Sequence, residues 1–417
     1  MKLTNLSGKY ITPERIFMFS ALFVNAGNYI YNLALGRLLG PKEFADAAIL
    51  ITFLLVLSFL AMTFQLVTAK YAVLFENNVF INFLGLLTKY TFLIGVMLGV
   101  LIIVFSKNLQ NIFNTSTSNM FVYFGLGVPI YFLMSINRGV FQGYKKFDQL
   151  SITYQSEMLS RLIITLTLLY FIKVQSSILV AIGILISFVF GMFPFKIKRI
   201  PIKKIVLSSE HKRVVLKFFL LTAFYECTQI IINNSDILLV KHYFDSYQAG
   251  LYASLALIGR VVYFVAWMFV MLLLPTVVKK EKERQPHAGV LLKYVGYISL
   301  LSLAIVTGSY LFPELVVKIM FGKAYISIAP LLWKYALATS VFAISNVFAY
   351  YFLSIDRYVP VILSALLGVA QVVLIIWFHD SLDQVVLVQI IAMMLLLLVQ
   401  LLFFSSYILK KRNTVKQ

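Results

Sequence analysis

Charged residues occur inside apolar runs of this chain, where a charge placed at membrane depth costs about 3 kcal/mol. Glu157 and Arg161 stand four residues apart in one such run, so a helix would place both on one face. Arg138 lies near the end of the preceding run, and Arg260 stands alone in a later run. Because arginine matches the geometry of phosphate groups, these residues predict a route for a polar, anionic group.

Each of these charges also has a structural alternative. Glu157 and Arg161 could form a self-neutralising pair that only supports packing, and Arg138 could reach the membrane surface with its long side chain. Arg260 has no acidic residue within its own helix turn, and its main alternative is a pair with Glu226 of the neighbouring run. The binding hypothesis assigns a cationic cavity to Arg161, Arg260 and Arg138.

Acidic and amide side chains complete the set of candidates. Glu157, Glu226 and Asp236 are the candidates for ion coupling or gating. In the first apolar run, asparagines recur at spacings of three and four, and a further asparagine follows in the seventh run. The side chains are those of Asn25, Asn28, Asn32 and Asn233. They either join helices by hydrogen bonds or line a polar lumen.

The composition is that of a polytopic membrane protein. Of 417 residues, 61% are hydrophobic and 12% are charged, against about 25% charged in a soluble domain. The single cysteine excludes a disulfide framework, and the four histidines do not have the spacing of metal ligands. We therefore expect no metal, no cofactor and no catalytic residue, with proton or sodium coupling as an open alternative. The net charge of +20 is attributed to the positive-inside rule and not to a nucleic-acid partner.

Twelve apolar stretches are each long enough to cross a membrane core, which takes about 20 residues. The predicted fold is therefore an all-α integral membrane protein with twelve transmembrane helices. The spans are expected at 15–37, 44–70, 84–105, 120–141, 150–172, 177–195, 213–241, 247–278, 289–312, 328–352, 359–378 and 384–409. One alternating set of connections, with both termini, carries 22 Lys and Arg and the other carries 7, which predicts that both termini are cytoplasmic.

The spans divide into two halves around a basic segment. Residues 1–195 are expected to form an N-terminal six-helix bundle, and 213–409 a C-terminal one. The segment 196–212 is expected to be a basic cytoplasmic linker, and 410–417 a cytoplasmic tail.

The two halves also show weak internal similarity. An offset of 205 places 39–47 on 244–252, and an offset of 211 places 141–147 on 352–358. Repeats with an even number of spans are related by an axis along the membrane normal, as in many transporters. A substrate is then expected between the halves.

Two motifs resemble a known family. The stretch Gly36–Phe44, and the pattern Arg138-Gly139…Gln142-Gly143…Phe147 with its following Glu157 and Arg161, resemble the bacterial polysaccharide-transport family. That family belongs to the multidrug/oligosaccharidyl-lipid/polysaccharide flippase superfamily. Departures are the pair Ala45-Asp46, where glycine is frequent, and the lack of the Arg-Gly…Gln-Gly pattern in the second half.

The resemblance implies a MATE-like fold and a non-enzymatic function. Family members move undecaprenyl-diphosphate-linked oligosaccharides across the bacterial inner membrane, for O-antigen, capsule or exopolysaccharide assembly. For this chain we expect alternating access, in which the two halves rock to expose the site to each side in turn. The implied partners are the lipid-linked substrate, membrane lipids, and a polysaccharide polymerase with its chain-length regulator.

Three other functions stay open at this point. A multidrug or cation antiporter of the same superfamily would favour acidic cavity residues. A membrane polymerase or ligase of polysaccharides would need a large outer loop, whereas the outer connections 106–119 and 313–327 are short and poor in acids. A scaffold for the assembly machinery would leave the buried charges without a role.

Overall fold

In the computed structural model, the described part of the chain is helical and contains no β-strand. The all-α class expected from the sequence is confirmed. The predicted linker 196–212 falls largely outside the described part. The described residues are 13–172, 176–194 and 209–416, apart from 264–265, 267–272, 274–276, 278–279, 282 and 356.

The first two expected spans form one continuous element, α1 (Pro13–Leu74), which consists of two helices joined at a kink. Gly40 makes the kink with φ 70° and ψ 173°, a conformation that essentially only glycine adopts. Pro41 follows, and its fixed φ angle suits the first position of the next helix. The Gly-Pro pair therefore turns the chain without a loop.

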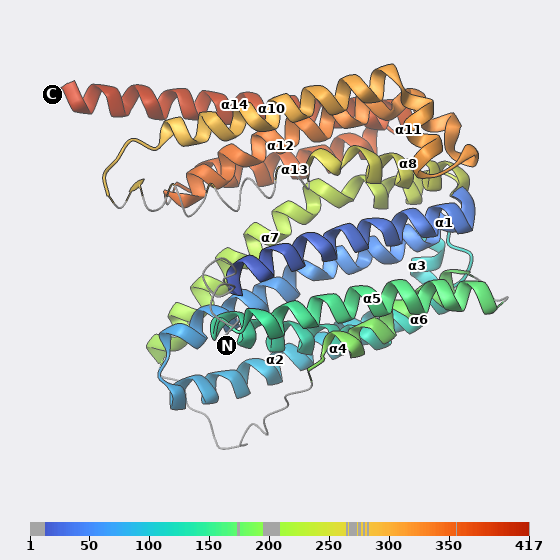
Figure 1. Cartoon of the computed structure of the whole chain (residues 1–417), viewed down its shortest axis with the longest axis horizontal. Helices are drawn as coiled ribbons and strands as arrows, with labels where there is room; N and C mark the ends of the chain where they lie inside the picture. Colours follow the sequence, from blue (N-terminus) through green and yellow to red (C-terminus); the bar gives the residue numbers. More distant parts are fainter. Residues whose placement is uncertain are drawn as a thin grey trace, which may run out of the picture. The chain divides into compact units, whose positions relative to one another are not determined.

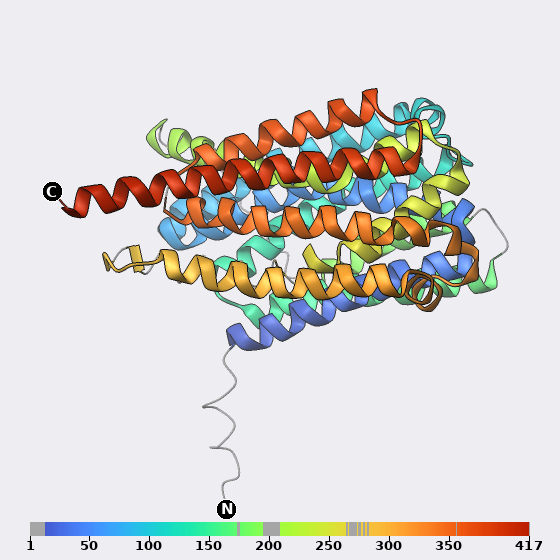
Figure 2. The same cartoon turned by 90° about the horizontal axis from the view of Figure 1, so that it is seen from above.

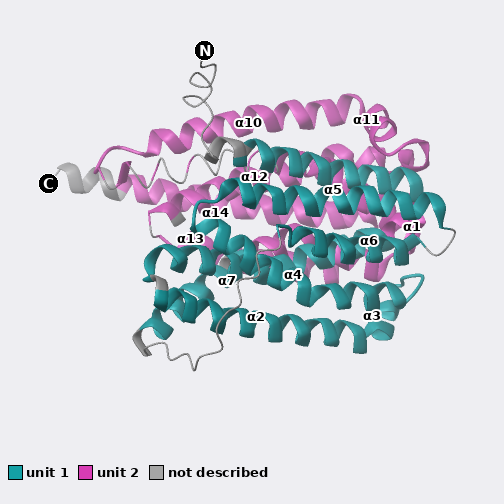
Figure 3. Ribbon diagram, turned by 60° about the horizontal axis from the view of Figure 1, so that its bottom comes forward, with its two compact units in different colours: residues 1–39, 46–227 teal, residues 40–45, 228–417 magenta. Residues whose placement is uncertain are grey.

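The chain forms two compact units, coloured separately in Figure 3: residues 1–39 with 46–227, and residues 40–45 with 228–417. The division falls inside α7 (Ser209–Tyr243), between Cys227 and Thr228. The division that the sequence predicts, in the basic segment 196–212, stays a prediction.

In unit 1, α4 is the central helix and packs against α2, α3, α5 and α6. Two glycines bring α4 close to α2: a Cβ atom on Gly99 would lie 2.5 Å from the carbonyl oxygen of Gly125. Small residues of this kind let membrane helices approach backbone to backbone. The helices of unit 1 after α1 are α2 (Asn77–Val104), α3 (Ser106–Ile112), α4 (Asn119–Gly143), α5 (Phe147–Phe171) and α6 (Ser176–Gly191).

In unit 2, α12 is central and packs against α8, α10, α13 and α14. Figures 1 and 2 show α10, α12, α13 and α14 running alongside one another. A buried core around Val347, Phe348 and Tyr351 joins α12 to α10 and α14. The elements are α8 (Ser246–Gly259), α10 (Ala288–Leu311), α11 (Pro313–Met320), the 3₁₀ helix η1 (Lys323–Leu331), α12 (Leu332–Ser354), α13 (Val359–Trp377) and α14 (Leu382–Lys416).

Residues 40–45 belong to unit 2 because they pack onto its helices. The Pro41 carbonyl oxygen lies so close to Gly250 of α8 that a Cβ atom there would meet it at 1.7 Å. Phe44 is buried, with its ring centroid 5.6 Å from that of Phe321. The kink of α1 is therefore fixed by packing as well as by its own backbone.

Eight helices of the described part are long and apolar enough to cross a membrane. The chain is thus a multi-pass membrane protein, as its composition indicates. The α5 helix and the 16-residue α6 are not among the eight, and α1 counts once although it covers two expected spans. The number twelve and the orientation of the termini stay predictions.

One expectation about an individual segment is wrong. The eighth span was expected as one helix over 247–278, but α8 ends at Gly259 and the chain turns at Arg260 before the next helical residues. The outer connections contain short helices, α3 in 106–119 and α11 in 313–327.

One of the two weak repeats has an equivalent backbone geometry. After α4, the Lys146 N–H donates to the Phe141 carbonyl at 2.8 Å, and after α12 the Arg357 N–H donates to the Phe352 carbonyl at 2.9 Å. These pairs correspond at the expected offset of 211. Both helices therefore end with the same hydrogen bond between residues five apart, although Asp356 lies outside the described residues.

Candidate functional site

In unit 1, Arg138 of α4 forms a buried ion pair with Glu157 of α5. The Arg138 Nη2 atom lies 2.7 Å from Glu157 Oε2, and both residues are less than 10% exposed. The guanidinium also donates to the Thr153 hydroxyl and carbonyl at 3.1 Å each and covers the ring of Tyr154 at 3.8 Å. Arg138 is thus held inside the bundle, and the expectation that it reaches the membrane surface is wrong.

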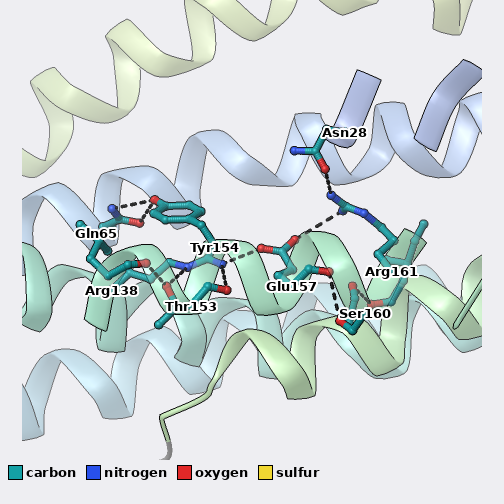
Figure 4. A network of polar contacts seen from close by, with 11 residues as sticks. Asn28, Gln65, Arg138, Thr153, Tyr154, Glu157, Ser160 and Arg161 are labelled. Atoms are coloured by element: carbon teal, nitrogen blue, oxygen red, sulfur yellow. Dashed lines mark hydrogen bonds and ion pairs between the residues drawn. The ribbon is translucent and has the colours of Figure 1, made fainter. Parts of the chain in front are cut away.

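Arg161, one turn along α5, contacts the other side of the same carboxylate. Its Nη1 atom lies 3.4 Å from Glu157 Oε1, so the pair expected from the i, i+4 spacing is present. Its Nη2 atom donates to Asn28 Oδ1 of α1 at 2.5 Å, and Tyr31 places its ring 5.5 Å from the guanidinium. Figure 4 shows Glu157 between the two guanidinium groups.

The charges of this cluster do not balance. Arg138 and Arg161 share the single carboxylate of Glu157, which leaves one buried positive charge in excess. The Nε atom of Arg161 is buried and has no hydrogen-bond partner among the described residues. A buried donor without a partner typically costs 1–3 kcal/mol, more if it is charged. The cluster therefore has an unused capacity to bind an anion.

A layer of neutral polar groups lies next to the cluster. The Gln65 amide of α1 donates to Gln142 Oε1 at 2.8 Å and lies 3.0 Å from the Tyr154 hydroxyl. Through Tyr154, this layer contacts the Arg138 guanidinium. The side chains of α1, α4 and α5 are thus joined in one network (Figure 4).

In unit 2, Arg260 pairs with Asp236 of α7. The Arg260 Nη2 atom lies 2.8 Å from Asp236 Oδ1 and 3.1 Å from Oδ2, and Asp236 is 1% exposed. Arg260 is the C-terminal cap of α8, where a positive charge also interacts favourably with the helix dipole. The expected alternative pair of Arg260 with Glu226 is therefore wrong, because Asp236 is the partner.

Tyrosine and amide side chains saturate this second pair. The Tyr335 hydroxyl donates to Asp236 Oδ2 at 2.8 Å and accepts from Arg260 Nε at 3.1 Å. The Tyr252 hydroxyl donates to the same carboxylate oxygen at 3.1 Å and accepts from Gln389 at 2.8 Å. One positive and one negative charge balance here, and all three nitrogens of Arg260 have acceptors.

A cavity of about 20 Å³ lies beside the Arg260–Asp236 pair. Gln371 and Gln389 line it, and Gln371 Oε1 has no hydrogen-bond partner within the described part. The cavity has room for about one water molecule. Because binding sites for organic ligands measure about 300–1,000 Å³, it does not hold a sugar or a phosphate ester.

A comparison with known protein families identifies the family of this chain. The model of the polysaccharide biosynthesis protein family matches residues 34–330, which is more than half of the sequence. The chain belongs to this family. No curated protein matches the sequence of this family member.

Solved structures show that the family member shares its fold with transporters. It is similar to the lipid II flippase MurJ in an inward closed conformation, with 17% identity, 94% of this chain and 87% of that chain covered, and a TM-score of 0.76. It is also similar to a multidrug resistance MATE family transporter of the MOP superfamily, with 14% identity, 92% and 95% coverage, and a TM-score of 0.75. A MOP superfamily transporter from Pyrococcus furiosus matches with 13% identity, 94% coverage of both chains and a TM-score of 0.54.

The motif that suggested this family has a packing role in the structure. A Cβ atom on Gly139 would lie 2.6 Å from the Gln65 carbonyl oxygen, and one on Gly143 would lie 2.7 Å from the Ala69 carbonyl oxygen. The two glycines therefore let α4 approach α1. That approach brings Gln142 within reach of Gln65.

The remaining candidates have different surroundings. Glu226 on α7 is half-buried and makes no hydrogen bond or ion pair with any described residue. Asn32 and Asn233 each donate to a carbonyl one turn earlier in their own helix, at 2.8 Å, and Asn25 is exposed. Of the four asparagines, Asn28 alone is joined to the charged network, whereas Asn233 lines the small cavity of unit 2.

The sequence reasoning missed the neutral partners of both clusters. These residues are Gln65, Thr153 and Tyr154 in unit 1, and Tyr252, Tyr335 and Gln389 in unit 2. The glutamines inside apolar runs could have indicated some of these partners, because a buried amide needs a hydrogen-bond partner. The tyrosines were not distinguishable in a chain with 24 of them.

Proposed function

We propose that this protein is a flippase that moves undecaprenyl-diphosphate-linked oligosaccharide units across the bacterial inner membrane. The observation that carries the proposal is the excess positive charge of the Arg138–Glu157–Arg161 cluster. A charge that is only structural would be expected to be neutralised, as Arg260 is by Asp236. An uncompensated buried guanidinium favours an anionic ligand.

The chemistry of a lipid-linked diphosphate suits this cluster. Transfer of the diphosphate out of water is favourable only where fixed cationic groups donate hydrogen bonds to it. The guanidinium of arginine offers several such donors in one plane. Arg161 has its free Nε donor for such an oxygen, and its contact with Glu157 is the longer one at 3.4 Å. In the proposal, Arg161 binds the diphosphate, while Arg138 positions Glu157.

The proposed roles of the other candidates follow from their partners. Arg260 stabilises unit 2 together with Asp236, so neither is assigned to substrate or ion coupling. Glu226 is the acidic candidate without a partner in the described part, and we assign to it any coupling to protons or sodium. Replacing Glu226 by Gln should then remove the dependence of export on the pH or sodium gradient.

The family and the fold support the direction of this proposal. The family is that of a polysaccharide biosynthesis protein. MurJ, which shares the fold, is named a lipid II flippase. Twelve spans, cytoplasmic termini and alternating access by two halves are part of the proposal. So are the absence of enzymatic activity and the neighbouring polymerase and chain-length regulator.

The test is the accumulation of lipid-linked oligosaccharide inside cells that carry variants of Arg161. Arg161→Gln should reduce export at least tenfold at normal protein level, and Arg161→Lys should retain part of it because the charge remains. Lys89→Gln is the matched control, since Lys89 is an exposed cation of α2. Normal export by Arg161→Gln at normal protein level would refute the cationic site.

The same cells separate the two rival functions. A multidrug antiporter would restore drug resistance in a strain that lacks its efflux pumps, and this rescue would not depend on Arg161. A polymerase or ligase would leave unpolymerised product on the outer side when the gene is deleted, whereas a flippase leaves it inside.

A further inference from the structure

A second, much larger cavity lies at one end of unit 2 and measures about 640 Å³. The end of α7, the start of α8, η1 and the turn between α13 and α14 border it. The charge bias of the connections predicts that this end faces the outside of the cell. The volume is in the range of sites for organic ligands.

Aromatic rings from two separate elements form part of its wall. Tyr243 at the end of α7 stacks on His379 with ring centroids 3.7 Å apart and planes 24° apart. Tyr247 in the first turn of α8 also lines the cavity. Tyr243 is 37% exposed and Tyr247 47% exposed, so both retain ring surface that a ligand can cover.

Carboxylate and amide groups line the same cavity. Asp245 Oδ1 accepts the N–H groups of Tyr247 and Gln248 at 2.8 and 3.1 Å, which fixes the orientation of the carboxylate. The Asp380 carboxylate and the Gln248 amide make no hydrogen bond with any residue in the described part of unit 2. The Nδ1 atom of His379 lies 3.2 Å from the Ile375 carbonyl oxygen. In the tautomer that donates this hydrogen bond, the Nε2 atom is an acceptor.

The charge of this cavity is opposite to that of the arginine cluster. Of the described residues that line it, none is Lys or Arg, whereas Asp245 and Asp380 are acidic. A phosphate or a uronic acid would be repelled there, and the site lacks the cationic donors that an oxyanion requires. The hydroxyl groups of a sugar, in contrast, can donate to the Asp245 carboxylate, whose orientation is already fixed.

We propose that this cavity binds an uncharged sugar of the glycan, at a site separate from the one that binds the diphosphate. The C–H face of a sugar ring covers the tyrosine rings, and its hydroxyl groups donate to Asp380, Asp245 and His379. The inference rests on the proposed function, because it assigns the sugar part of that substrate to unit 2. An organic cation is the competing ligand, since aromatic rings and carboxylates also attract cations.

The first test measures sugar binding to the full chain in nanodiscs that contain no sugar-based detergent. Saturation-transfer NMR with maltose and N,N′-diacetylchitobiose should give signals from ring protons. Tyr243→Ala and Tyr247→Ala should weaken binding about tenfold, and Asp380→Asn severalfold. Tyr170→Ala is the control, because Tyr170 is an exposed tyrosine of unit 1 and should change nothing.

The second test uses the cell's own glycan in the export assay. The double variant Tyr247→Ala/Asp380→Asn should lower export severalfold at normal protein level, and Tyr170→Ala should not. The proposal is overturned if this variant exports normally and neither sugar binds, or if choline binds in preference to both sugars. The export assay of Arg161→Gln tests the flippase function and does not depend on sugar binding in unit 2. A failed sugar site and a failed flippase function are therefore distinguishable.

Discussion

The buried charges of the two units differ in their balance and in how completely they are bonded. In unit 1, Arg138 and Arg161 share one carboxylate, and Arg161 Nε has no partner in the described part. In unit 2, Arg260 and Asp236 neutralise each other, and two tyrosines complete the network. A saturated ion pair is explained by folding alone, whereas an unsaturated one requires a further explanation.

The difference assigns the two clusters to different properties of the protein. The cluster of unit 2 resembles a structural ion pair, whose loss costs stability because it leaves one charge buried and unpaired. The cluster of unit 1 should tolerate the loss of Arg161 better, since Glu157 keeps its shorter contact with Arg138. Stability and export should therefore respond to different arginines.

The largest effect on stability is expected from Asp236→Asn. It leaves the Arg260 guanidinium buried without a counter-charge, which should lower the free energy of unfolding by about 3–5 kcal/mol. The melting temperature of the purified protein in detergent measures this. The double variant Asp236→Asn/Arg260→Gln should recover much of the loss, and a wild-type melting temperature for the single variant would refute the structural role.

Glu157→Gln should be next, at about 3 kcal/mol, because it leaves two buried guanidinium groups without a carboxylate. The expected loss is smaller than for Asp236 because the Asp236 carboxylate also accepts hydrogen bonds from the hydroxyl groups of Tyr335 and Tyr252. Inorganic pyrophosphate should raise the melting temperature of this variant more than that of the wild type. Equal shifts in both proteins would argue against an anion at this cluster.

Arg161→Gln should lower the free energy of unfolding by only about 1–2 kcal/mol, the scale of one charged hydrogen bond. The reason is that Glu157 stays paired with Arg138. Denaturation with Arg260→Gln as the comparison measures the contrast, since that change leaves Asp236 unpaired. If both arginine variants lose the same stability, the distinction between the clusters is wrong.

The smallest effects are expected from the neutral groups around each cluster. Gln65→Leu in unit 1 and Gln389→Leu in unit 2 should each cost about 1 kcal/mol, because each removes an amide bonded at 2.8 Å to a neutral group. Thermal melting of the two variants side by side measures them. A loss comparable to that of Asp236→Asn would mean that the amides, and not the charges, hold the clusters.

Much of the fold was readable from the sequence, since long apolar runs in a chain with few charges indicate membrane helices. Arg161 and Glu157 were also readable, because a spacing of four residues places two side chains on one helix face. The partner of Arg260 was misjudged. This partner, Asp236, lies 24 residues away on another helix, and no local spacing connects them. The turn at Arg260 was missed because a single glycine inside a long apolar run, here Gly259, does not by itself end a helix.

By itself, the sequence determined that the chain is a helical membrane protein, that Glu157 and Arg161 are neighbours, and that one helix ends and the next begins between residues 37 and 44. These properties depend on composition, helix periodicity and backbone conformation, which are local. Only the tertiary structure decided which charges are neutralised. Arg138 from α4 reaches the carboxylate that Arg161 already contacts, and Asp236 from α7 reaches Arg260. Charge balance in a buried site depends on which helices pack together, and helix packing joins residues that are far apart in sequence.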